Sequence, residues 1–563
     1  MKYIKCVIIV YLAFITLLIF SLTGKIYGVN DDVIIQNWLS GVFTGKPEFM
    51  IRGSATPKIS FGFLLSNLYS FAPNINWFPI SILGITLISW FILGLVSFRA
   101  KNYLVVASYL ILSFLYLIWF IPSPTYTAAA IILSFSVFIY FAINVLDSKI
   151  SKFNVILAFL LSLSYLIRPE SFILGFVTAL SFIIYAITKT SIKNRILMRN
   201  LLTPILIFFS VVLIDASFEK IYYSQHQDWV KYSKWEDARY KIQANAPEKA
   251  VSDDPQKYGW TRSEVELFKT YNFIDRKIFT TEKFNDLLKD TNSSRTVINF
   301  NFIENAHQRI FDGNINWNWI NLISMISLFS AIFFFSSFPK IKDYFLLSGA
   351  SLIILYLVML YVSGFLRQPE RVQLSAIFLA NLVSILGFSF TIRPSLKFSW
   401  GKNLFLNATV FILIISLVYS QTNIFKNKVG KNIGAFWIDQ TKYLENYPKD
   451  SIFVGNASQF RNNYVSPYSL KYFDIENRIF TFGWHNFSPH WDLRARQLGL
   501  DPDNILENVI NDDRVYWVSG RDSMNFIVEF MKEKNLTFVG PNEVGKMENF
   551  GEEYIVWKFN END

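Results

Sequence analysis

The sequence predicts an α-helical polytopic membrane protein with about eleven transmembrane helices and a C-terminal α/β domain outside the membrane. Three observations support this fold class. Hydrophobic residues make up 52 % of the 563 residues and charged residues only 17 %, which is more apolar than an ordinary soluble chain. Apolar runs of membrane-spanning length recur along the first three quarters of the chain. The remaining quarter alternates short strand-like and helix-like segments instead.

A transmembrane helix needs about 20 mostly apolar residues. The runs that approach this length are 4–23, 78–98, 103–121, 126–146, 153–167, 171–188, 200–217, 317–338, 344–363, 372–392 and 403–421. Arg168-Pro169-Glu170 interrupts 153–188, so that stretch forms either two spans or one broken re-entrant hairpin. Lys2 and Lys5 precede the first run as in a signal peptide, but no small-residue cleavage site follows it. We therefore expect a retained helix.

The charges of the short loops predict the topology. With a cytoplasmic N-terminus, the cytoplasmic segments contain as acids only Asp147 and Asp343. Their basic residues are Lys2, Lys5, Arg99, Lys101, Lys149, Lys152, Lys189, Lys193, Arg195, Arg199, Lys340, Lys342, Arg393, Lys397 and Lys402. This bias follows the positive-inside rule. It also accounts for the net charge of +10 without a nucleic-acid partner. We expect a multi-pass protein of the plasma membrane.

Three long segments then lie on the outer side: 24–77, 218–316 and the tail from 422. We expect two domains, a transmembrane region over 1–421 that includes the first two segments, and an extracytoplasmic α/β domain over 422–563. In the tail, Ser451–Gly455, Arg514–Val518 and Tyr554–Phe559 have the composition of strands. Residues 501–511 and 522–534 have that of helices, each opened by an Asp suited to a cap, Asp501 and Asp522.

The first outer segment contains the main catalytic candidates. Asn30-Asp31-Asp32 follows the first span by a few residues, so its carboxylates should lie near the outer membrane surface. Apolar residues then recur at helical spacing over 33–43, which predicts a helix in the membrane interface. Adjacent, partly buried carboxylates suit a general base, with Asn30 in support. The alternative is that Asp31 or Asp32 only caps the helix.

Arginines at the outer ends of spans are the second group of candidates. Arg168 belongs to Arg168-Pro169-Glu170, and Arg367 and Arg371 belong to Arg367-Gln-Pro-Glu-Arg371. The guanidinium group binds phosphate oxygens in a bidentate manner, so these three side chains suit a lipid-linked phosphate. Tyr126, after the Pro122–Thr125 turn, and Glu170 would support them. The alternative is that each arginine snorkels to headgroups or pairs with Glu170 or Glu370.

Metal and cofactor signals are sparse. Asp31 and Asp32 offer oxygen ligands that suit Mg²⁺ or Mn²⁺, although two carboxylates do not define a site. Cys6 is the only cysteine, which excludes a disulfide framework, and the usual glycine-rich nucleotide loops are absent. Gly483–Trp491 contains His485 and His490 in an aromatic stretch. It is typical of a carbohydrate platform, but packing is the simpler interpretation.

Together these features resemble the integral membrane glycosyltransferases of the C-type fold (GT-C). The resemblance covers about 1–421 and rests on Asn30-Asp31-Asp32 after the first span, Ser40-Gly41…Thr44-Gly45-Lys-Pro47, Leu68-Tyr69, Trp235–Arg239 and Tyr258-Gly259-Trp260. It implies a transferase acting on cell-envelope glycans at the outer face. The donor would be a polyprenyl-phosphate sugar and the acceptor a glycan or lipid-linked saccharide. An Asp would act as base, and arginines would stabilise the departing phosphate.

Other functions fit parts of the same pattern. A polymerase of lipid-linked polysaccharide repeat units would also have many spans and a large outer segment such as 218–316. A transporter or flippase of lipid-linked saccharides would show internal repeats, whereas seven expected spans precede that segment and four follow it. A scaffolding membrane protein would leave the carboxylates and arginines without a common role. The sequence specifies neither the sugar nor the acceptor.

Overall fold

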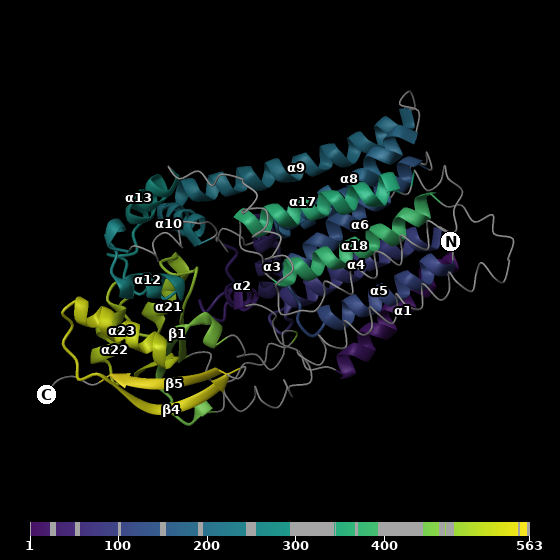
Figure 1. Cartoon of the computed structure of the whole chain (residues 1–563). Coiled ribbons are helices and arrows are strands. Elements are labelled where there is room, and N and C mark those ends of the chain that lie inside the picture. The colour runs from purple at the N-terminus through teal and green to yellow at the C-terminus, as the bar shows by residue number, and fades with distance from the viewer. Residues whose placement is uncertain are drawn as a thin grey trace. The chain divides into compact units, whose positions relative to one another are not determined.

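The computed structural model describes residues 2–22, 30–50, 57–99, 103–146, 154–189, 195–243, 255–292, 343, 345–365, 370–391, 443–460, 468, 478–549 and 552–559. The chain divides into two compact units (Figure 1). We call Met1–Lys25, Pro79–Ala216 and Ile298–Ile433 the helical unit. Ile26–Phe78, Ser217–Val297 and Gly434–Asp563 are the mixed unit.

The helical unit is built from long apolar helices. Its described elements are α1 (Lys2–Leu22), α4 (Trp77–Arg99), α5 (Tyr103–Phe120), α6 (Tyr126–Leu146), α7 (Asn154–Ile167), α8 (Pro169–Lys189), α9 (Arg195–Gln225), the π-helical turn η2 (Phe345–Gly349), α17 (Ala350–Phe365) and α18 (Glu370–Thr391). The residues of α4 before Pro79 and of α9 after Ala216 belong to the mixed unit.

Six described helices are long and apolar enough to cross a membrane. They contain Tyr3–Ser21, Trp77–Arg99, Tyr126–Leu146, Pro169–Lys189, Leu202–Gln225 and Leu346–Ser363. The expected spans 103–121, 153–167 and 372–392 correspond to α5, α7 and α18, whose apolar stretches are shorter. Those at 317–338 and 403–421 lie outside the described residues. By length and composition, the described part of the chain therefore contains six candidate membrane spans.

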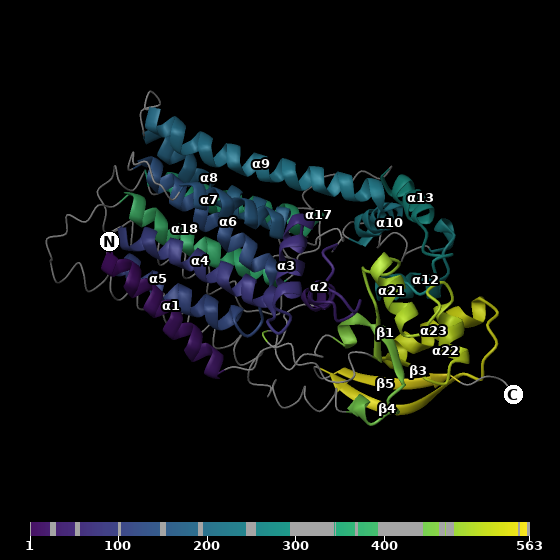
Figure 2. The ribbon, with the colours of Figure 1, turned by 180° about the vertical axis from the view of Figure 1, so that it is seen from behind.

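Close packing of α6 against α8 depends on a glycine. A Cβ on Gly175 of α8 would meet Ser134 Oγ and the carbonyl oxygen of Ile131, both on α6. Small residues let membrane helices approach in this way, and Figures 1 and 2 show both helices among the long helices of this unit. The interrupted stretch 153–188 forms two helices, α7 and α8, separated only by Arg168. Pro169 opens α8, where its missing N–H costs nothing.

The mixed unit draws its elements from three distant segments. The first segment supplies α2 (Asn30–Ser40) and α3 (Ile59–Phe71). The second supplies α10 (Gln227–Gln243), the 3-10 turn η1 (Gln256–Tyr258), α12 (Arg262–Lys269) and α13 (Thr281–Asn292). The tail supplies β1 (Ile452–Asn456), the 3-10 turn η3 (Ala457–Gln459), β2 (Ile479–Phe482), α21 (Pro489–Gln497), α22 (Ile505–Asn511), β3 (Val515–Ser519), α23 (Arg521–Glu533), β4 (Pro541–Asn549) and β5 (Glu552–Phe559).

The tail folds around a five-stranded sheet of order β2-β1-β3-β5-β4. β1 pairs parallel with β2 and β3, whereas β5 pairs antiparallel with β3 and β4. The expected strands are β1, β3 and β5, and the expected helices are α22 and α23. The two expected caps are wrong, because Asn504 and Gly520 occupy the N-cap positions. Asp501 instead accepts the Asp503 backbone N–H and the Asn504 side-chain N–H.

Side chains alternate between the two faces of this sheet, as the period of a strand requires. Val515 and Trp517 of β3 lie in the large core of the mixed unit, whereas Val518 lies in a smaller cluster. The large core also contains Met50 and Ile59 from the first segment and Trp229, Trp235 and Trp260 from the second. Residues 26–78 and 217–297 thus group with the tail, across the domain boundary expected at residue 421.

Candidate active site

Helix α2 carries both candidate carboxylates. It begins at Asn30, so Asp31 and Asp32 occupy its first turn rather than the N-cap position of the capping alternative. Carboxylates are stabilised there by the positive end of the helix dipole. The side chain of Asp31 is half-buried, whereas that of Asp32 is only 1 % exposed. Of the two, Asp31 is therefore the more accessible to a substrate.

Tryptophan from the tail holds Asp31. The indole Nε1–H of Trp484 donates a hydrogen bond to Asp31 Oδ1 at 3.1 Å, although the two residues are 453 positions apart. No local pattern predicts this pairing, because such patterns do not report contacts over so long a separation. The expected base thus has a partner in the aromatic stretch 483–491.

The helix expected over 33–43 corresponds to α2, which ends at Ser40, with residues 41–43 in the following turn. Protein side chains cover this stretch. Its apolar residues Ile34, Ile35, Trp38, Leu39 and Phe43 are all buried. The ring of Trp38 makes edge contacts with the rings of Trp484 at 5.4 Å, His485 at 5.8 Å and His490 at 5.2 Å. An amphipathic pattern alone does not distinguish a membrane surface from a protein surface, since both bury the apolar face.

Both histidines of the tail are buried packing residues. His485 and His490 are 2 % and 6 % exposed. Burial lowers the pKa of His485 to about 3 and that of His490 to about 4, in spite of backbone hydrogen bonds at Thr481 and Met50. Both rings are therefore neutral at pH 7. The packing interpretation of this stretch is confirmed, and a carbohydrate platform at these two rings is excluded by their burial.

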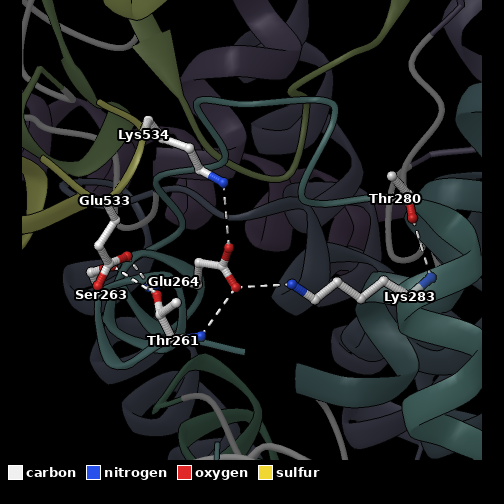
Figure 3. A network of polar contacts seen from close by, with 7 residues as sticks. All are labelled: Thr261, Ser263, Glu264, Thr280, Lys283, Glu533 and Lys534. Atoms are coloured by element: carbon white, nitrogen blue, oxygen red, sulfur yellow. Dashed lines mark hydrogen bonds and ion pairs between the residues drawn. The ribbon is translucent and has the colours of Figure 1, made fainter. Parts of the chain in front are cut away.

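A network of polar contacts ties the second segment to the tail (Figure 3). Thr261 and Glu264 form a capping box at the start of α12. Thr261 Oγ1 and Ser263 Oγ also donate to Glu533 Oε2 on α23, at 2.8 and 2.5 Å. Lys283 Nζ from α13 lies 2.9 Å from Glu264 Oε2. These contacts cross-link three helices outside the apolar core.

Deeper in the second segment, α10 contains a buried ion pair. Arg239 binds Glu236 through two hydrogen bonds of 2.6 Å, and both side chains are at most 4 % exposed. Bidentate geometry offsets the cost of removing both charges from water. The guanidinium group also lies over the rings of Tyr271 and Phe273. Trp235–Arg239, a stretch on which the GT-C resemblance rests, is thus part of the core.

In the helical unit, Arg168 gathers the other expected polar residues. Its Nη1 donates to Thr127 Oγ1 at 2.6 Å and to Tyr126 Oη at 3.3 Å. Glu170 Oε2 lies 3.7 Å from its Nε. The structure therefore brings Arg168, Tyr126 and Glu170 together and adds Thr127. The ion pair with Glu170 is the contact that the alternative interpretation of Arg168 expected. Arg168 is only 9 % exposed, so its guanidinium group is held in place rather than freely extended.

The structure describes the remaining candidates, Arg371, Arg367 and Asn30, only in part. Arg371 is the second residue of α18 and is half-buried. Arg367 lies outside the described residues, and for Asn30 the structure describes the helical backbone but not the side chain. Asp31 and Asp32 belong to the mixed unit, and Arg168, Tyr126 and Arg371 to the helical unit. Over the described ranges, no group of three or more His, Cys, Asp or Glu residues gathers as a metal site.

Sequence reasoning missed Trp484 as a partner of the site. The available signal was the stretch Gly483–Trp491, whose density of aromatic and polar residues is unusual for a surface turn. It indicated burial, but not the surface against which these side chains would pack.

No protein-family model matches the sequence, and no curated protein matches it either. Two solved structures are similar to this chain, namely crystal structures of ArnT from Cupriavidus metallidurans bound to undecaprenyl phosphate and in the apo state. Each shares 9 % sequence identity at a TM-score of 0.40, over 98 % of this chain and 97 % of the other.

Proposed function

We propose that this protein is a membrane glycosyltransferase that moves a sugar from a polyprenyl-phosphate donor to a surface glycan or lipid-linked acceptor. One observation carries the proposal: Asp31, in the first turn of α2 soon after α1, is half-buried and oriented by a hydrogen bond from Trp484. A general base needs such a fixed position. The sequence resemblance to GT-C enzymes supplies the substrate class.

In the proposed reaction, Asp31 takes the proton of an acceptor hydroxyl group. The acceptor oxygen attacks the anomeric carbon of the sugar, and the bond from that carbon to the phosphate oxygen of the lipid breaks. Negative charge then develops on the departing phosphate, which arginine side chains stabilise. Arg168, Arg367 and Arg371 are the candidates for this role. Asp32 lies in the same first turn of α2 and is only 1 % exposed.

We infer that this chemistry takes place on the outer face of a plasma membrane. The N-terminus would be cytoplasmic and the three segments of the mixed unit extracytoplasmic, as the loop charges predict. Polyprenyl-linked sugars serve as donors where nucleotide sugars are not available. Reporter enzymes fused to the tail test this orientation, when one reporter is active only inside the cytoplasm and the other only outside it. A cytoplasmic tail would contradict it.

Transfer by purified protein in proteoliposomes tests the reaction, with surface glycans of a deletion strain identifying the substrates. We expect Asp31→Asn to lower transfer about 100-fold or more, the usual contribution of a general base. Asp32→Asn should lower it less. Asp228→Asn is the matched control, because that carboxylate on α10 is exposed (84 % for its side chain). Full activity of the Asp31→Asn protein at normal abundance would refute the base assignment.

The same assay separates the alternatives. A flippase would move its lipid without forming a glycosidic bond, and a polymerase would consume lipid-linked repeat units. Divalent cation binding by Asp31 and Asp32 stays a prediction, with Mg²⁺ and Mn²⁺ the ions that their oxygen ligands suit. Transfer that EDTA abolishes and Mn²⁺ restores would support it. Undiminished transfer in EDTA would contradict it.

A further inference from the structure

Trp484 is one of the residues at which the three segments of the mixed unit meet. It belongs to the tail, its side chain contacts Asp31 and Trp38 of the first segment, and its carbonyl oxygen accepts a hydrogen bond from Tyr232 of the second. We propose that Trp484 is a positioning residue that orients the carboxylate of Asp31 for proton transfer. This inference rests on the proposed function, in which Asp31 is the base.

The side chain of Trp484 contacts α2 at two points. Its Nε1–H donates to Asp31 Oδ1 at 3.1 Å, and its ring meets that of Trp38 at 5.4 Å and an interplanar angle of 77°. Asp31 and Trp38 are seven residues apart, so they lie two turns apart on one face of the helix. A single indole thereby restrains both the rotation of α2 about its axis and the orientation of the Asp31 carboxylate.

The backbone of Trp484 is itself fixed. Tyr232 Oη donates to its carbonyl oxygen at 3.0 Å. In the surrounding turn, the N–H of Gly483 donates to Asn486 Oδ1 at 2.6 Å, and Asn486 Nδ2 donates to the carbonyl oxygen of Phe273 at 2.5 Å. All these residues are in the mixed unit. The tail and the second segment therefore act together to hold the indole against Asp31.

This arrangement predicts a specific kinetic effect. Effective proton transfer depends on orientation, and a small misplacement of a catalytic group lowers the rate by up to about 100-fold. Trp484 acts on the base and not on the lipid phosphate. Its loss should therefore lower kcat and leave the KM for the polyprenyl-phosphate sugar unchanged. General destabilisation of the unit would instead lower the amount of active protein.

Trp484→Phe tests the proposal, because phenylalanine keeps an aromatic ring against Trp38 and removes the N–H. In the full-length protein we expect kcat to fall about tenfold or more, with the donor KM within about twofold of the wild type. Trp491→Phe is the matched control. Trp491 is also buried in the tail and donates its Nε1–H at 3.0 Å, but to the carbonyl oxygen of Thr481. Its replacement should leave kcat unchanged.

Tyr232→Phe provides a second test that leaves the indole in place. It removes the hydrogen bond to the Trp484 carbonyl oxygen, and we expect a smaller fall in kcat with the donor KM unchanged. Wild-type kcat in the Trp484→Phe protein, at equal Tm, would overturn the inference. If the Trp484→Phe protein has a lower Tm than the wild type, wild-type kcat in the Tyr232→Phe protein would overturn the inference instead. Loss of transfer in Asp31→Asn with normal Trp484→Phe kinetics would refute this inference alone, whereas an active Asp31→Asn protein would refute the proposed base.

Discussion

Acidification should destabilise the mixed unit through its two buried histidines. Burial lowers the pKa of His485 to about 3 and of His490 to about 4, whereas an unfolded histidine titrates near about 6.5. Between about pH 6.5 and pH 4, the unfolded chain therefore binds protons that the folded chain does not. The free energy of unfolding must therefore fall as the pH falls through this window. The full stabilisation from the two neutral rings is present only above the window.

The size of this effect follows from the same pKa values. Each histidine contributes about 1.4 kcal/mol per pH unit within the window. From pH 7 to pH 5 the loss is about 2 kcal/mol for each ring and about 4 kcal/mol for the pair. For a unit of this size, that corresponds to a fall in Tm of about 4–8 °C for each histidine.

Thermal unfolding of the full-length protein in detergent, followed by tryptophan fluorescence at pH 7 and pH 5, measures the effect. His485→Phe keeps a ring beside Trp38 and removes one titrating group, so the fall in Tm between the two pH values should be about half that of the wild type. His226→Phe is the control, because His226 is exposed between α9 and α10. An unchanged pH dependence in the His485→Phe protein would refute the reasoning.

Three further predictions concern single contacts. Glu236→Gln leaves the buried charge of Arg239 without its carboxylate and should lower the free energy of unfolding by about 3–5 kcal/mol, measured as a lower Tm. Asp228→Asn, at an exposed position, should leave Tm unchanged. Equal Tm values for the Glu236→Gln protein and the wild type would contradict this account. Gly175→Ala places a methyl group against Ser134 and the Ile131 carbonyl oxygen and should reduce the yield of folded protein. Gly84→Ala is the control and should leave the yield unchanged, because no atom lies within 4 Å of the new Cβ. Arg168→Lys keeps the charge but loses the planar group that contacts Thr127 and Tyr126, so we expect transfer to fall about tenfold; a wild-type rate would argue against Arg168 as a phosphate ligand.

Local patterns in the sequence were sufficient for the long apolar helices and for much of the tail. The expected spans 78–98, 126–146 and 171–188 correspond closely to α4, α6 and α8. An apolar run of this length is typical of a membrane-spanning helix. The strands β1, β3 and β5 were recognisable from their apolar and β-branched residues. By contrast, β2, β4 and α21 were missed. Four residues of β2 carry too little periodicity, and β4 is an exposed edge strand.

For the candidate site, the sequence determined which residue types follow the first span: the carboxylates Asp31 and Asp32 and the amphipathic helix after them. Only the tertiary structure decided what covers that helix. Trp38 is packed by Trp484, His485 and His490, and a hydrogen bond from Trp484 orients Asp31. The physical reason is that hydrophobic periodicity reports which face of an element is buried, but not the partner that buries it. That partner is selected by shape and hydrogen bonding between segments more than 400 residues apart, which no local pattern encodes.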